Sequence, residues 1–206
     1  MDIERRTAGN TAIVLIDYVT GFAPMIRSQT VAENAAGGRA LVQTANTFGV
    51  PAVVSIGPRN DPRGPLYPEI AAVLGDHPVV HRGLSFDAFD DEGFASAVAA
   101  TGRRHLVVAG LMTDGCVMHS VLSALRAGYR VSVVVDATAS ETAAAHDAAL
   151  ARFTQLGVVP RSWLSFASEL QRSYANVETL TAFREIQSNS PAYAMLNATL
   201  APAARR

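Results

Sequence analysis

The sequence contains a single cysteine, so no disulfide bond can form within the chain and no oxidising compartment is implied. It has no apolar run near the ~20 residues that a membrane-spanning helix needs. It also lacks an excess of either charge, because 17 basic residues nearly balance 18 acidic ones and no basic run occurs. This balance gives no reason to expect nucleic acid or an anionic membrane surface as a partner. The first ten residues are polar and do not resemble a signal peptide, so we expect a cytoplasmic protein.

Six short runs rich in β-branched residues alternate with longer stretches rich in alanine and leucine. The runs span Thr11–Asp17, Pro51–Ile56, Pro78–His81, His105–Gly110, Val131–Asp136 and Val158–Leu164. They are apolar without alternation, which is typical of parallel strands that are covered on both faces. Four glycines stand where the intervening helices should end: Gly49, Gly102, Gly128 and Gly157. We therefore predict one α/β domain over residues 1–206, a Rossmann-like three-layer α-β-α sandwich with a six-stranded, mostly parallel sheet.

Residues 165–206 break this pattern, because two or three short helices follow with no strand after them. Four large side chains in this tail would leave a sizeable apolar surface if they packed on nothing: Phe183, Tyr193, Met195 and Leu196. Such a tail packs either on its own domain or on a neighbouring subunit. We favour the subunit contact, and we therefore predict a homo-oligomer that assembles through the C-terminal helices.

Three of the predicted strand ends carry residues that can do chemistry. Asp17 ends the first strand, Arg82 follows the third, and Cys116 follows the fourth and opens a helix. Since ligands bind at the carboxyl ends of the strands in open α/β sheets, all three should face one rim. Each residue also has a structural interpretation. Cys116 could be a small buried residue, Asp17 could cap a turn, and Arg82 could pair with a surface acid. Their joint placement favours a nucleophilic thiol, and a helix N-terminus beside a cation should hold the pKa of that thiol below about 8.5.

Three segments resemble, in order, those of the isochorismatase-like cysteine hydrolases: IVLIDYVTGF, VVHRGLSFDAF and GLMTDGCVMHSVLSALRAGYRVSVVVDA. The third is the most specific, since its Gly, Thr, Cys-Val, Gly-Tyr and Asp-Ala all fall in the family's order. Arg82, the loop GPRNDPRGPLYPEI and the C-terminal tail are similar to the YcaC-type branch, whose members form ring-shaped oligomers. The resemblance implies a catalytic triad of Asp17, Arg82 and Cys116.

The same resemblance implies the rest of the site. A cis peptide bond is expected between Met112 and Thr113, and the backbone N–H groups of Thr113 and Cys116 would hold an oxyanion. The family's mechanism needs no metal or organic cofactor, and the zinc-binding histidine pattern of nicotinamidases is missing from this sequence. Isochorismatases proper lack the cysteine, which argues against isochorismate as the substrate. We therefore predict hydrolysis of an amide-like C–N bond in a small molecule through a thioester on Cys116.

The expected substrate pocket contains Phe22, Phe86, Phe89 and His119. A phenylalanine at such a position is still more often a core residue, and His119 fits the pocket and the core equally well. Other functions stay open: a catalytically silent member of the fold that binds a metabolite, a redox-sensitive thiol at Cys116, or a purely structural oligomer subunit. A nucleotide-binding domain is disfavoured, because no G-x-G-x-x-G follows the first strand and no G-x-x-x-x-G-K-[ST] occurs.

Overall fold

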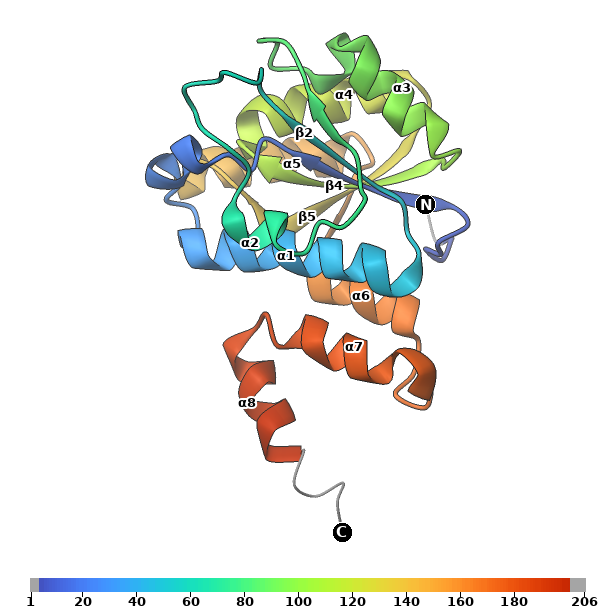
Figure 1. The fold of residues 1–206 in the computed structure, drawn as a ribbon. Coiled ribbons are helices and arrows are strands. Elements are labelled where there is room, and N and C mark those ends of the chain that lie inside the picture. The colour runs from blue at the N-terminus through green and yellow to red at the C-terminus, as the bar shows by residue number, and fades with distance from the viewer. Residues whose placement is uncertain (1–3, 201–206) are drawn as a thin grey trace.

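The computed structural model describes residues 4–200 and contains a central sheet with helices on both faces (Figure 1). Its strands are β1 (Thr11–Ile16), β2 (Ala52–Ile56), β3 (Val79–His81), β4 (His105–Leu111), β5 (Arg130–Ala139) and β6 (Val159–Arg161). They lie in the order β3-β2-β1-β4-β5-β6, and every neighbouring pair is parallel. The predicted α/β sandwich with a six-stranded sheet is therefore confirmed.

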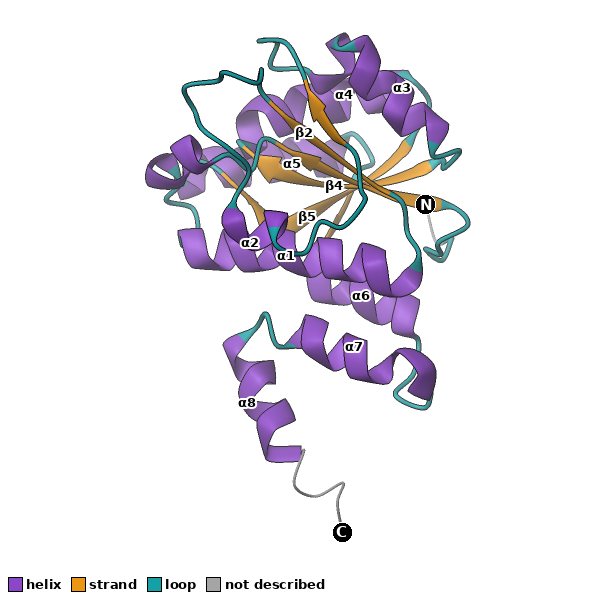
Figure 2. Cartoon of the chain, in the orientation of Figure 1, coloured by secondary structure: helices purple, strands orange, loops and turns teal. Residues whose placement is uncertain are grey.

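Helices cover both faces of the sheet (Figure 2), and a hydrophobic core lies on each face. One is covered by α1 (Val31–Phe48), α2 (Pro68–Ala71) and α6 (Trp163–Gln171), the other by α3 (Glu92–Ala100), α4 (Met118–Arg126) and α5 (Ala143–Gln155). Along β1, Ile13 and Leu15 pack in the first core, whereas Val14 and Ile16 pack in the second. This two-sided burial explains why the strands read as continuous apolar runs. The four predicted helix-ending glycines all have positive φ, as expected of C-caps.

The order in which strands are added to the sheet reverses at its centre, between β1 and β4. After β1 it adds β2 and then β3 on one side, and it then crosses over to place β4 on the other side of β1. Open α/β sheets bind their ligands at such a switch point, beyond the carboxyl ends of the strands. Asp17 directly follows β1, Arg82 directly follows β3, and Cys116 lies in the turn after β4. The topology therefore brings the three predicted residues to one rim.

The C-terminal tail is partly a component of the monomer core. Helix α7 (Val177–Gln187) packs against α1 and α6, and its Phe183 and Ile186 are only 3% and 1% exposed. The expectation that Phe183 would be left for a subunit contact is wrong, because α7 lies along α1 and α6 and needs an apolar face there. Helix α8 (Pro191–Leu200) differs: Met195 is 73% exposed and Leu196 is 47% exposed. No helix within residues 4–200 is both long and apolar enough to cross a membrane.

The closest approach of β4 to β1 requires a residue without a side chain. Gly110 has a φ of 141°, and a Cβ atom there would lie 2.0 Å from the carbonyl oxygen of Ile16. Gly49 also has a positive φ, of 66°, but a Cβ atom there would meet no atom within 4 Å. Both glycines thus have a positive φ, but only at Gly110 would a Cβ atom also collide with a neighbouring strand.

We predict that Gly110→Ala lowers the free energy of unfolding by at least about 3 kcal/mol, because the new methyl group collides with the backbone of the neighbouring strand. Gly49→Ala is the matched control, and it should cost only about 1 kcal/mol from the left-handed backbone. Urea denaturation of both variants and the wild type measures the difference. Equal losses in the two variants would contradict the proposed close contact.

Candidate active site

Asp17 is placed by a backbone turn at the end of β1. Its φ is 53°, in the left-handed region that aspartate tolerates better than most residues, and its N–H donates to the carbonyl oxygen of Ser55 at 2.8 Å. The side chain is fully buried. The end of β1 thus directs a carboxylate into the protein at the switch point, where a merely structural turn residue would usually reach solvent.

Arg82 pairs with this carboxylate from the other side of β2. Its N–H donates to the carbonyl oxygen of Ile56 at 3.0 Å, which fixes the backbone just after β3. Its guanidinium donates through one terminal nitrogen to Asp17 Oδ2 and through the other to the carbonyl oxygen of Ser85. The side chains of Arg82 and Asp17 are 1% and 0% exposed. The alternative interpretation of Arg82 as a surface ion-pair partner is therefore wrong, since the pair is completely buried.

Cys116 lies in a short helical turn, η3 (Thr113–Val117), that precedes α4. Within η3 only Gly115 departs from helical geometry, with φ −110° and ψ −112°. The helical course therefore restarts at Cys116 and continues into α4, whose assigned range begins at Met118, so the prediction that Cys116 opens the helix is confirmed. Cys116 is thus at the N-terminal end of α4, and it is 5% exposed.

The non-proline cis peptide bond joins Leu111 to Met112. The expected position, between Met112 and Thr113, is wrong by one residue. Strand β4 ends at Leu111, so the chain already leaves the strand direction at the Leu111–Met112 bond. Met112 then has an extended backbone, with φ −93° and ψ 151°, and Thr113 is the first residue of η3.

The electrostatics of the thiol differ from the expectation of a lowered pKa. Burial, followed by the charge of Asp17 and hydrogen bonding with it, raises the pKa of Cys116 to about 12, and Arg82 only partly opposes this. Burial also raises the pKa of Asp17, against the lowering effects of Arg82 and of the Cys116 thiol. The expected pKa below about 8.5 is wrong, because burial, which the expectation left out, adds to the opposing charge of Asp17 and outweighs the cation and the helix end. The resting thiol is therefore protonated at neutral pH.

One carboxylate oxygen of Asp17 is available to the thiol. Oδ2 accepts from Arg82, whereas Oδ1 is buried and accepts no hydrogen bond within ordinary geometric limits. The Cys116 thiol is close enough that hydrogen bonding to Asp17 shifts the pKa of both groups. The arrangement therefore combines a protonated thiol, a carboxylate that can accept its proton and a fixed cation.

Arg63 is a second cation near the site that the sequence analysis did not predict. Its Nε donates to Asp61 Oδ1 at 2.9 Å, and its guanidinium carbon lies 5.4 Å from the ring centroid of Phe22. The charge of Arg63 lowers the pKa of Asp17. Hydrogen bonding to Asp61 raises the pKa of Arg63, and the charges of Asp17, Asp61 and Cys116 add to this effect. In the sequence, Arg63 is indicated only by the loop after β2, which contains the run Asp-Pro-Arg-Gly. That loop pointed to the YcaC-type branch and not to a site residue.

This loop is held against the end of β1 by backbone hydrogen bonds. The N–H of Gly21 donates to the carbonyl oxygen of Arg63 at 2.6 Å, and that of Thr20 donates to Pro65 at 3.0 Å. A Cβ atom on Gly21 would lie 2.5 Å from the Arg63 carbonyl oxygen, so glycine permits the close approach. The position of the Arg63 guanidinium therefore depends on the backbone as well as on Asp61.

The four aromatic residues expected in a substrate pocket lie in different places. Phe22 lies beneath Arg63, as described above. Phe86 is 68% exposed, and its ring centroid is 6.2 Å from that of His119, which is also exposed. Phe89 instead packs edge-on against Phe94, at 5.2 Å, in the second core. The core interpretation thus accounts for Phe89, whereas His119 belongs to the surface with Phe86.

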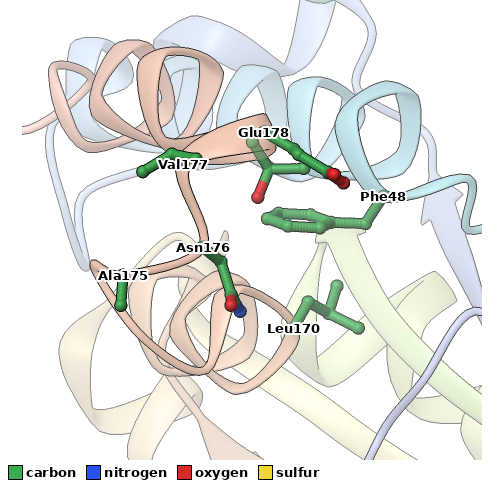
Figure 3. Close-up of a pocket in the computed structure, with 7 residues that line it drawn as sticks. Phe48, Leu170, Ala175, Asn176, Val177 and Glu178 are labelled. Carbon is green, nitrogen blue, oxygen red and sulfur yellow. The ribbon is translucent and has the colours of Figure 1, made fainter.

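Two cavities differ in their relation to this site. A small cavity of about 180 Å³ has Arg82 on its wall, and is lined by Arg82, Gly83, Leu84, Ser85, Asp87, Asp90 and Asp91. A larger one of about 440 Å³ lies between the end of α1 and the start of α7, where Phe48, Leu170 and Glu178 face it (Figure 3). The larger cavity contains no residue of the predicted site. Within residues 4–200, no three His, Cys, Asp or Glu side chains come together as a metal site.

Comparisons with known proteins agree with the fold and the motifs. Residues 11–164 match the family model of the isochorismatase domain. The probable hydrolase YcaC of Escherichia coli K12 is 32% identical over 172 residues, which cover 84% of this chain and 83% of that protein. The crystal structure of E. coli YcaC, described as an octameric hydrolase of unknown specificity, has a TM-score of 0.90 at 29% identity, over 98% of this chain and 99% of that one. Pseudomonas aeruginosa YcaC, solved with hexane-2,5-diol and covalent acrylamide, has a TM-score of 0.89 at 32% identity, with the same coverage. The chain belongs to the isochorismatase family.

Proposed function

We propose that this isochorismatase-family hydrolase uses Cys116 as a nucleophile to cleave an amide-like C–N bond in a small molecule. The observation that carries the proposal is the buried Asp17–Arg82 ion pair beside the chain's only cysteine. A buried charge pair is expensive to desolvate, and a fold gains little stability from it. Its place next to a thiol, at the switch point of the sheet, therefore favours a catalytic role.

The proton of the thiol has one suitable acceptor. All 17 basic residues of the chain are arginine, and a guanidinium does not give up its proton in a protein. Arg82 therefore supplies charge and hydrogen bonds only. Asp17 takes the proton from Sγ of Cys116 as the sulfur attacks the carbonyl carbon, so that attack and proton transfer are coupled.

The remaining steps return the proton and release the acid. The C–N bond breaks when the tetrahedral intermediate collapses, and Asp17 gives its proton to the leaving amine. A water molecule then attacks the thioester while Asp17 accepts a proton from it, and the Cys116 thiol is restored. The backbone N–H groups of Thr113 and Cys116 hold the oxyanion in both halves, each worth about 3–4 kcal/mol in comparable enzymes.

Two further observations support a reactive thiol over a redox sensor. The P. aeruginosa relative carries covalently bound acrylamide, and acrylamide reacts with nucleophilic side chains. Redox-sensing cysteines, in contrast, are exposed and have a low pKa. Cys116 is buried and its pKa is raised, so it has neither property.

Cys116→Ala should abolish turnover, by more than about 10³-fold in kcat, while leaving the fold intact. Purified protein is screened against amides, ureas and carbamoyl compounds for ammonia release, and the fastest compound then serves as the test substrate. Circular dichroism confirms that the variant is folded. Near-normal turnover by Cys116→Ala would overturn the assignment of the nucleophile.

Asp17→Asn should make Cys116 more reactive toward iodoacetamide at pH 8, although it should abolish turnover. The negative charge of Asp17 raises the pKa of the thiol, so its removal lowers that pKa and increases the thiolate fraction.

In the wild type, with a pKa of about 12, the alkylation rate should still rise at pH 9 without a plateau. Because the amide leaves Arg82 buried without its partner, we also expect a loss of about 3–5 kcal/mol in stability. A wild-type midpoint below about 8.5 would contradict the account.

We further propose that the chain forms a homo-oligomer through α8. The exposed apolar side chains of this helix are Met195, Leu196 and Leu200, and the E. coli relative is octameric. Truncation after Phe166 would be a poor test, because it would also remove Phe183 from the monomer core.

Replacing both Met195 and Leu196 by Asp should therefore reduce the mass measured by light scattering, because charges in an apolar contact are costly. Val177→Asp is the matched control, since Val177 is 73% exposed on α7, outside α8. The control should keep the wild-type mass. A full-length chain that is monomeric at micromolar concentration, or a double variant of unchanged mass, would contradict the proposal.

A further inference from the structure

A chain of hydrogen bonds connects α5 to the turn that carries the nucleophile. Nδ1 of His146 lies 2.8 Å from Oγ1 of Thr113, and this oxygen lies 3.0 Å from Oγ1 of Thr138. The Thr138 hydroxyl in turn donates to the carbonyl oxygen of Gly110 at 2.7 Å. Both threonines are completely buried, so water does not replace these bonds. None of these side chains has a role in the mechanism above.

The donor and acceptor of each of these hydrogen bonds follow from counting protons. A hydroxyl has one proton, and a carbonyl oxygen can only accept. Since Thr138 donates to Gly110, it must accept from Thr113. Thr113 therefore has no proton left for His146 and must accept a hydrogen bond from it. Nδ1 of His146 consequently carries the hydrogen, and the neutral ring must be the Nδ1–H tautomer.

The turn is fixed at a second point by the adjacent residue. Asp114 Oδ1 accepts from the hydroxyl of Ser140 at 2.7 Å, just beyond the end of β5. Thr113 and Asp114 open η3, and Cys116 follows two residues later. The turn is thereby attached to β5 through Thr138 and next to β5 through Ser140. Within residues 4–200, the side-chain hydrogen bond of His146 is the only one that attaches it to α5.

We infer that His146 is a positioning residue for the oxyanion donors. By donating to the Thr113 side chain, it fixes the rotamer of Thr113 and with it the peptide plane whose N–H is proposed to hold the oxyanion. This inference rests on the proposed function of Cys116 and Thr113. Because the oxyanion forms only in the transition state, loss of this alignment lowers kcat and leaves KM nearly unchanged.

His146→Ala should lower kcat by about 10-fold or more, since small displacements of catalytic groups have effects of this order or larger. His146→Asn should recover activity to within about threefold, because the Asn amide places an N–H near the position of Nδ1. His77→Ala is the control, as His77 is bonded to Asn46 and has no contact with the turn. A purely structural role would lower stability without this rescue and without the split between kcat and KM.

Two outcomes would overturn the inference: a wild-type kcat in His146→Ala, or an Asn variant as impaired as the Ala variant. A readout independent of turnover is the ¹⁵N spectrum of the imidazole in the full-length protein at pH 8. It should show hydrogen on Nδ1 of His146, and an Nε2–H tautomer would overturn the inference as well. Iodoacetamide labelling of Cys116 should proceed at the wild-type rate in His146→Ala. Failure of the proposed function is recognised separately, because Cys116→Ala would then retain turnover.

Discussion

The buried ion pair between Asp17 and Arg82 is the interaction on which the rest of the site depends. It connects the chain after β1 to the chain after β3, two strands that are separated by β2. Strand β3 has only three residues, so the pair joins a short edge strand to the centre of the sheet. Each of these buried charges is compensated by the other, and removal of either residue leaves an unpaired charge in the interior. This mutual dependence keeps the carboxylate fixed beside the thiol.

The pair also determines how the thiol can react. A thiolate in this environment would lie beside the carboxylate of Asp17, and burial would deprive it of solvent. The stable arrangement is therefore a neutral thiol next to an ionised Asp17 that is paired with Arg82. In the proposed mechanism, this thiol becomes nucleophilic when its proton moves to Asp17 during attack on the substrate. The site is thus suited to coupled proton transfer and attack, and resting reactivity toward oxidants stays low.

The sequence was sufficient to predict the strands, the helix ends and the gathering of Asp17, Arg82 and Cys116 at one rim. These features follow from local patterns: two-sided burial gives continuous apolar runs, and C-caps require positive φ. The topological rule for open α/β sheets then supplies the common rim. The resemblance added the proposal that these three residues act as a catalytic triad, which periodicity alone does not give.

The features that were missed depend on contacts between distant parts of the chain. Arg63 reaches the site only because its loop lies across the end of β1, and no local pattern indicates this. Phe183 looked available for a subunit contact, yet α7 packs against α1. The pKa of Cys116 is set by burial and by a carboxylate 99 positions away, so a helix end and a cation were insufficient grounds for its direction. His146 lies on α5, 33 positions after Thr113, and only the fold brings its ring within 2.8 Å of the Thr113 hydroxyl.

The proposed thioester mechanism requires the free thiol of Cys116, and the single cysteine of the chain allows a direct measurement. Methyl methanethiosulfonate adds only an S-methyl group, and intact-mass spectrometry reports the modified fraction at each time point. The account predicts that hydrolysis of the test amide falls in direct proportion to the modified fraction and reaches zero when modification is complete. It also predicts that dithiothreitol restores the activity. Fully modified protein that still hydrolyses the amide would contradict the account.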